Sequence, residues 1–398
     1  MKKDINDPGR ALYARLNRKN YLIIAALLAL CVVTCVGDVL TAAASPMYRL
    51  SVQEVLSCLL HPSQASAGTY VIVINMRLPI AVMAVVIGFS LGSAGAVMQT
   101  ILHNPLASPY TLGVGTAAGF GASLAIILGL GSIATSALSF VFAMLICFMI
   151  YFMGRNNINS GALVLSGIAC LFLFQALQAL LQYGASEDQN QSIVFWSFGS
   201  LQRTDWYKLL ITAVVTFVCT PIIFADSWKY TALTMGDERA VSLGVNVSRL
   251  KIKSFFLISL MAAVSVCFTG SIGFIGLAGP HIARMIAGED QRFYIPISAL
   301  CGSLLLSLAS VISKVLQPGS VFPIGIVTSI IGVPFFFSPR RDFLLRFSSV
   351  TPMRIRSATF FVTVCGTIPC AWLYAVWIAR RRSVSSIAAR MDSVTWSA

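Results

Sequence analysis

The hydrophobic pattern of the chain is a series of long apolar runs separated by short polar segments. A helix that crosses a bilayer needs about 20 mostly apolar residues, and each run approaches that length. Backbone amides and carbonyls find no water inside a bilayer, so each run is expected to be helical. The pattern predicts an all-α integral membrane protein with about ten transmembrane helices. The runs are residues 21–44, 78–100, 111–130, 133–153, 161–182, 208–225, 254–270, 272–287, 295–316 and 322–338.

The composition agrees with a membrane protein. Hydrophobic residues make up 57% of the chain and charged residues only 11%, whereas soluble domains carry about a quarter charged residues. The net charge of +14 raises the question of nucleic acid. However, the basic residues gather in short segments between apolar runs, as the positive-inside rule expects. We therefore expect lipid, and no nucleic acid, as a partner.

The basic loops also predict the orientation. With ten spans and a cytoplasmic N-terminus, most basic loop residues fall on one side, and the opposite side holds Arg49, Arg77 and Arg203. The predicted cytoplasmic segments are residues 1–20, the loops near 101–110, 154–160, 226–253 and 288–294, and the chain after 338.

The charged groups also bear on the energy source. Acidic residues fall in loops or near span ends, whereas ion-coupled carriers commonly bury a carboxylate at mid-span. An ion-coupled secondary transporter is therefore the less favoured alternative. The chain contains no GxxxxGK[ST] phosphate-binding motif, no HExxH motif and no cysteine and histidine spacing typical of zinc sites. We expect no catalytic residue, no metal site and no enzyme activity in this chain.

Small residues recur at helical spacing in the second run. Gly88, Gly92 and Ala96 repeat every four residues, which predicts close helix packing. The sequence Gly-Ser-Ala-Gly at 92–95 recurs as Gly-Ser-Ile-Gly at 270–273. Together with ten spans of opposite polarity, this echo predicts an inverted repeat of the two halves.

Three parts of the chain are too polar or too broken for plain spans. The first is MRLP at 76–79, followed after a long helix by HNPLASP at 103–109. The second is GDERAVSLGV at 236–245, and the third is GFIGLAGPHIAR at 273–284. In the second, a short helix from Asp237 to Leu243 is predicted to end at Gly244 as a C-cap. It is either a docking helix for a partner or a solvated loop.

At these residues the chain resembles the iron-chelate and cobalamin (FecCD-type) permease family of ATP-binding-cassette (ABC) importers. GAVMQ at 95–99, WSFGSL at 196–201, FPIGI at 322–326 and GVP at 332–334 extend the resemblance over roughly residues 20–337. The resemblance implies a transmembrane permease domain at residues 21–338. The chain would then be a multi-pass subunit of a binding-protein-dependent importer in the bacterial inner membrane.

The resemblance also implies partners. A second permease subunit, the same or related, would complete the translocation path. Two ATP-binding-cassette subunits would bind ATP and Mg²⁺, so that this chain needs no cofactor of its own. A periplasmic or lipid-anchored binding protein would deliver the substrate. An iron-siderophore complex is the favoured substrate, and cobalamin or haem is the alternative.

Two cytoplasmic sites follow from the resemblance. In the loop 226–253, Leu243 and Val245 would supply apolar contact with the ATPase, and Glu238, Arg239 and Arg249 would set the register. A cytoplasmic gate would lie at Asn104, Pro105 and Leu106. The full set predicted for ATPase coupling is Gly236, Asp237, Glu238, Ala240, Leu243, Gly244, Val245 and Arg249.

The remaining predicted sites lie in the fifth run and on the outer face. Gln175, Gln178 and Gln182 share one helical face and either line the path, as the corresponding span does in the family, or bond to neighbouring helices. Arg77 matches a family arginine that binds the binding protein, while Ile80 stands where a second arginine is expected. Lys314 is predicted to replace another docking arginine.

The chain after residue 338 does not follow the family pattern. Residues 339–398 form an extension with an extra apolar segment at 358–379, flanked by arginines. As an eleventh span, this segment would place an arginine cluster outside, against the positive-inside bias.

Overall fold

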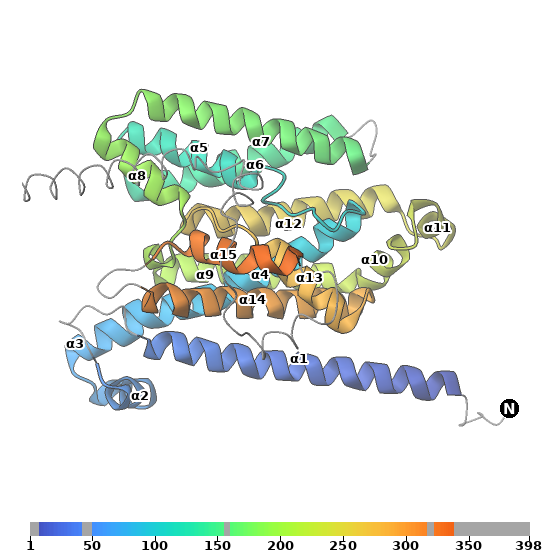
Figure 1. The fold of residues 1–398 in the computed structure, drawn as a ribbon, viewed down its shortest axis with the longest axis horizontal. Helices are drawn as coiled ribbons and strands as arrows, with labels where there is room; N and C mark the ends of the chain where they lie inside the picture. Colours follow the sequence, from blue (N-terminus) through green and yellow to red (C-terminus); the bar gives the residue numbers. More distant parts are fainter. Residues whose placement is uncertain (1–7, 42–49, 155–159, 317–321, 338–398) are drawn as a thin grey trace, which may run out of the picture. The chain divides into compact units, whose positions relative to one another are not determined.

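The computed structural model describes residues 8–41, 50–154, 160–316 and 322–337, and within these residues it is helical with no strand (Figure 1). The predicted C-terminal extension at 339–398 lies outside the described residues.

Each of the ten predicted apolar runs corresponds to a helix, which confirms the all-α membrane fold. Among the described residues, seven helical segments are long and apolar enough to cross a membrane. The helices that supply these segments are α1 (Pro8–Leu40), α4 (Leu78–Ile101), α6 (Gly131–Gly154), α7 (Ser160–Tyr183), α9 (Trp206–Ala225), α12 (Val247–Thr269) and α14 (Gln291–Val315). The other three runs form shorter helices, α5 (Val114–Ile127), α13 (Ile275–Ala287) and α15 (Ile324–Phe337).

Short helices occupy the connections. Before α4, the chain forms α2 (Val52–Leu60), a 3₁₀ turn η2 (Pro62–Gln64), α3 (Ala67–Tyr70) and a π-helical stretch η3 (Val71–Arg77). Later connections hold α8 (Glu187–Ser197), a 3₁₀ turn η4 (Leu201–Arg203), α10 (Ser227–Leu233) and α11 (Asp237–Ser242).

Helix α4 is the centre of the packing and is buried along nearly all of its length. It contacts α9, α12, α13 and α14, and α1 packs mainly against α14 and also touches α4. Helices α5, α6 and α7 pack against one another, and α6 and α5 also touch α12. Figure 1 shows α5, α6 and α7 above α12, and α1 below α14.

Small residues bring α4 close to its neighbours, as their spacing predicts. A Cβ added at Gly88 would overlap the carbonyl oxygen of Gly302 on α14, and one at Gly92 would overlap that of Ser298. A Cβ at Gly95 would overlap the backbone of Gly276 on α13. The helices therefore touch backbone to backbone at these positions.

The sequence echo does not mark equivalent structures. Residues 92–95 lie inside α4, whereas residues 270–273 form the non-helical break between α12 and α13. Gly270 and Phe274 both take positive φ in that break, 77° and 66°. The echo therefore gives no support to an inverted repeat, which stays a prediction.

Close packing at Gly92 predicts a large effect of one added methyl group. Gly92→Ala should destabilise the protein by about 1–3 kcal/mol, because the helices must separate to admit the methyl group. The measurement is the thermal unfolding temperature in detergent. Gly37→Ala on α1 is the matched control, because nothing lies within 4 Å of its Cβ position, and alanine favours a helix. Equal unfolding temperatures for the two variants would contradict this packing.

Candidate functional site

The predicted docking helix exists as α11, from Asp237 to Ser242, and is named here the coupling helix. It ends in a Schellman cap. The Gly244 N–H donates to Val241 O at 2.9 Å, and the Val245 N–H donates to Ala240 O at 3.0 Å. Gly244 has a φ of 84°, which glycine adopts without a Cβ clash. The predicted C-cap is confirmed.

The coupling helix and its flanks expose three apolar side chains. Val241 within the helix is 60% exposed, Leu243 just after it is 57% exposed, and Met235 just before it is exposed too. Glu238, Arg239 and Arg249 are exposed too, so they are free to set a register as predicted. Two predicted members lie elsewhere: Ala240 and Val245 are buried in the protein's own core. Val245 does not present its side chain at the surface, so its burial gives no support to the predicted contact with the ATPase.

Asp237, the first residue of the coupling helix, is held from two sides. Its Oδ1 lies 3.0 Å from His103 Nε2, and its Oδ2 accepts a hydrogen bond of 2.7 Å from Lys251 Nζ on α12. Partial burial acts to raise the pKa of the Asp237 carboxyl. Hydrogen bonds from Lys251 and His103 and the nearby positive charge outweigh burial and lower this pKa below its usual value.

His103 begins the predicted gate segment, residues 103–109, named here the gate loop. Its N–H donates to Thr100 O, and the Asn104 N–H donates to Gln99 O. These bonds form a Schellman cap on α4 in which His103, at φ 47°, takes the place usually held by glycine. A left-handed conformation costs a non-glycine residue about 1–2 kcal/mol.

The gate loop is a compact turn with exposed side chains at its tip. Asn104 Oδ1 accepts a bond of 2.9 Å from the Leu106 N–H, and Asn104 O accepts one of 3.1 Å from the Ala107 N–H. Pro105 is exposed, and Leu106 is 61% exposed. The loop then returns inward through buried Ala107, Ser108 and Pro109. The predicted gate residues are thus presented together at the end of α4.

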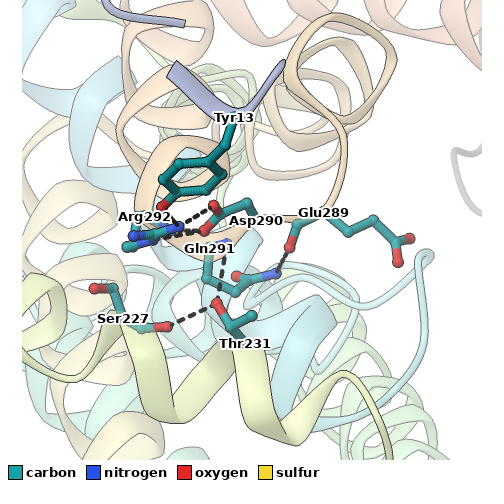
Figure 2. Close-up of polar contacts among 7 residues, drawn as sticks. All are labelled: Tyr13, Ser227, Thr231, Glu289, Asp290, Gln291 and Arg292. Carbon is teal, nitrogen blue, oxygen red and sulfur yellow. Dashed lines mark hydrogen bonds and ion pairs between the residues drawn. The ribbon is translucent and has the colours of Figure 1, made fainter. Parts of the chain in front are cut away.

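A second polar cluster, which the sequence did not reveal, ties four helices together near the same end of α4. Gln291 accepts a bond from Thr100 of α4 at 3.1 Å, and its backbone N–H donates to Thr231 of α10 at 3.3 Å. Arg292 binds Asp290 at 2.7 Å and donates to the Tyr13 hydroxyl of α1 at 2.9 Å. Figure 2 shows the Tyr13 ring next to the side chains of Arg292 and Asp290. The hydroxyl and amide partners are common residues far apart in sequence, so no spacing could have indicated them.

The three predicted path glutamines on α7 lie in different surroundings. Gln178 donates a bond of 3.1 Å to Ser197 of α8, and its amide lies against Gly119 of α5. Gln175 and Gln182 are partly exposed. Gln178 therefore makes the interhelical bond that was one alternative, while Gln175 and Gln182 remain predicted path residues.

The two predicted docking cations on the outer face differ in exposure. Arg77 is partly exposed and donates to Val39 O at 3.4 Å. Lys314 is only 4% exposed, and its ammonium lies 3.0 Å from both a carboxylate oxygen and the backbone oxygen of buried Asp38. Ser310 donates to the other carboxylate oxygen of Asp38. A cation so enclosed does not present itself to a binding protein, and the docking assignment of Lys314 is not supported.

Removal of this buried cation tests its structural role. Lys314→Met should destabilise the protein by about 3–5 kcal/mol, because Asp38 stays buried without its cation. The double variant Lys314→Met with Asp38→Asn should recover most of the loss. Thermal unfolding in detergent measures both. A single variant that unfolds like the wild type but captures a binding protein less well would instead restore the docking assignment.

Comparisons with known proteins agree with the geometry. The model of the FecCD transport family matches residues 27–339. A molybdate import system permease protein of Haemophilus influenzae is 34% identical, over 67% of this chain and 79% of the relative. A Helicobacter pylori protein named as permease of an iron chelatin transport system is also 34% identical, over 70% and 84%.

A solved structure has the same fold. It is an ABC transporter assigned to the metal-chelate type in an inward-facing conformation, with a TM-score of 0.70 and 30% identity. The match covers 79% of this chain and 97% of that chain. The helical membrane fold, the coupling helix and these similarities lead to one conclusion: the chain belongs to the FecCD transport family and is the permease of an ABC importer.

Proposed function

We propose that this permease carries an iron chelate of the siderophore class across the bacterial inner membrane, driven by ATP hydrolysis on two partner subunits. The observation that carries this proposal is the exposure of apolar side chains on and just after the coupling helix. Val241 and Leu243 are exposed while Ala240 anchors the helix in the core, which suits a contact in a partner's groove. The contact would lie in the cytoplasm, on the same side as the N-terminus.

The remaining partners follow from the architecture of such importers. A second permease subunit would face this one across the path, with Gln175 and Gln182 as polar lining. A periplasmic or lipid-anchored binding protein would deliver the substrate at the opposite end of the spans, where Arg77 remains the docking candidate. ATP and Mg²⁺ would bind to the ATPase subunits and not to this chain.

The nature of the substrate rests on the relatives. The structural neighbour is assigned to the metal-chelate type, and the Helicobacter pylori relative is named for iron chelatin. The Haemophilus influenzae relative is named for molybdate, which makes this oxyanion the competing substrate.

A charge on the exposed face should break the ATPase contact. Leu243→Glu, alone or with Val241→Glu, should weaken binding of the ATPase subunits about tenfold or more, because a carboxylate in an apolar groove loses its hydration. Co-purification and ATP hydrolysis measure this. Leu60→Glu is the control, because Leu60 is also an exposed leucine and lies on α2, away from the coupling helix. Normal assembly of the Leu243→Glu variant would remove the basis of the proposed docking.

Uptake by cells that depend on this transporter tests substrate and energy source together. Ferric siderophore should enter, should stop on depletion of ATP and should survive collapse of the proton gradient. Haemin, cobalamin and molybdate are measured in parallel. Uptake of molybdate without ferric siderophore would refute the substrate, and loss of uptake with the proton gradient alone would refute the energy source.

A further inference from the structure

Both carboxylate oxygens of Asp237, the first residue of the coupling helix, are bound within the protein. One oxygen is bound by His103 of the gate loop and the other by Lys251 of α12, whose side chain is nearly buried. A single carboxylate thus joins the coupling helix and the helix that follows it to the gate loop, 134 positions away in the sequence. The exposed neighbours Glu238 and Arg239 are left for contact with a partner.

The backbone of His103 points to a use for its side chain. The Schellman caps of α4 and the coupling helix are alike, yet Gly244 holds the left-handed position in one and His103 holds it in the other. A glycine at residue 103 would adopt this left-handed conformation without the steric cost of a Cβ atom. Strain kept at one residue is a reason to ask what its side chain does, and here the imidazole reaches Asp237 at 3.0 Å.

Hydrogen bonds hold together the part of the gate loop that directly follows His103. Asn104 binds the N–H groups of Leu106 and Ala107, so that residues 103–107 form one hydrogen-bonded turn. Leu106 protrudes from the tip of this turn. A shift of the coupling helix would therefore act on Leu106 through the pair of Asp237 and His103.

We propose that His103 is a positioning residue that transmits movement of the coupling helix to the gate through Asp237. This inference rests on the proposed function, because the movement would come from ATPase subunits docked on the coupling helix. The contact between His103 and Asp237 is partly exposed, and polar contacts at such a surface add little to stability. Loss of this contact should therefore change the movement of the gate and leave folding intact.

The experiment follows the gate directly, so it needs no substrate. The permease carries Leu106→Cys and is purified with its ATPase subunits in lipid nanodiscs. The rate of labelling by a maleimide is measured before and after trapping with ATP and vanadate. The complex without this substitution gives the blank for native cysteines. ATP hydrolysis and unfolding temperature are measured on the same samples.

With His103 present, trapping should change the labelling rate about fivefold or more, within the usual range of coupling between sites. His103→Gly should bring the ratio of the two rates to unity. Its ATP hydrolysis should persist, and its unfolding temperature should hold or rise because the backbone strain is relieved. His103→Arg should restore the change, because arginine offers Asp237 a cation and a hydrogen bond.

Two further variants make the result specific. Lys253→Gln breaks an ion pair of 2.7 Å to Asp226 without touching the gate loop, and it should keep the wild-type ratio. In an Asp237→Asn background, His103→Gly should have no additional effect. A wild-type ratio in His103→Gly, or a further loss in the Asp237→Asn background, would overturn the role of His103. Failure of the wild-type chain to bind any ATPase subunit would overturn the proposed function itself, and this inference with it.

Discussion

The last carbonyls of a helix have no partner within the helix and must bond to the chain that follows, to a side chain or to water. This constraint places the functional segments. The coupling helix and α4 both end in Schellman caps, through Gly244 and His103. Each cap turns the chain sharply and leaves one apolar side chain, Leu243 or Leu106, exposed next to it. The same requirement that closes the backbone therefore also presents the contact and gate residues.

The carboxylates at helix ends also have close polar partners. Asp226 and Asp237 lie at helix ends near the predicted cytoplasmic side. Asp226 is shared by Lys229 and Lys253, and Asp237 by Lys251 and the His103 imidazole. Asp38 is the deep exception, and it is closed off by Lys314 and Ser310. A carboxylate enclosed in this way is better suited to holding α1 against α14 than to carrying protons, because its cation is in direct contact. This agrees with a transporter that takes its energy from a partner.

The sequence predicted the helices and the coupling segment because hydrophobic length and a glycine C-cap are local signals. It predicted the close contacts of Gly88 and Gly92 because small residues at a spacing of four face one neighbour. It did not predict the burial of Val245, because a position after a helix can face either way. It did not predict the burial of Lys314 for a related reason: its partner, Asp38, lies on another helix 276 residues away.

The pairing of His103 with Asp237 belongs to the same class of long-range contact, since the two are 134 positions apart. One sign of it is nevertheless local. A histidine follows the last turn of α4, where a helix that stops abruptly before proline is usually capped by glycine. The departure from glycine is readable in the sequence once the helix end is known. A break in a local rule at a helix end can thus indicate a distant partner, and here that partner is the helix through which the permease would be driven.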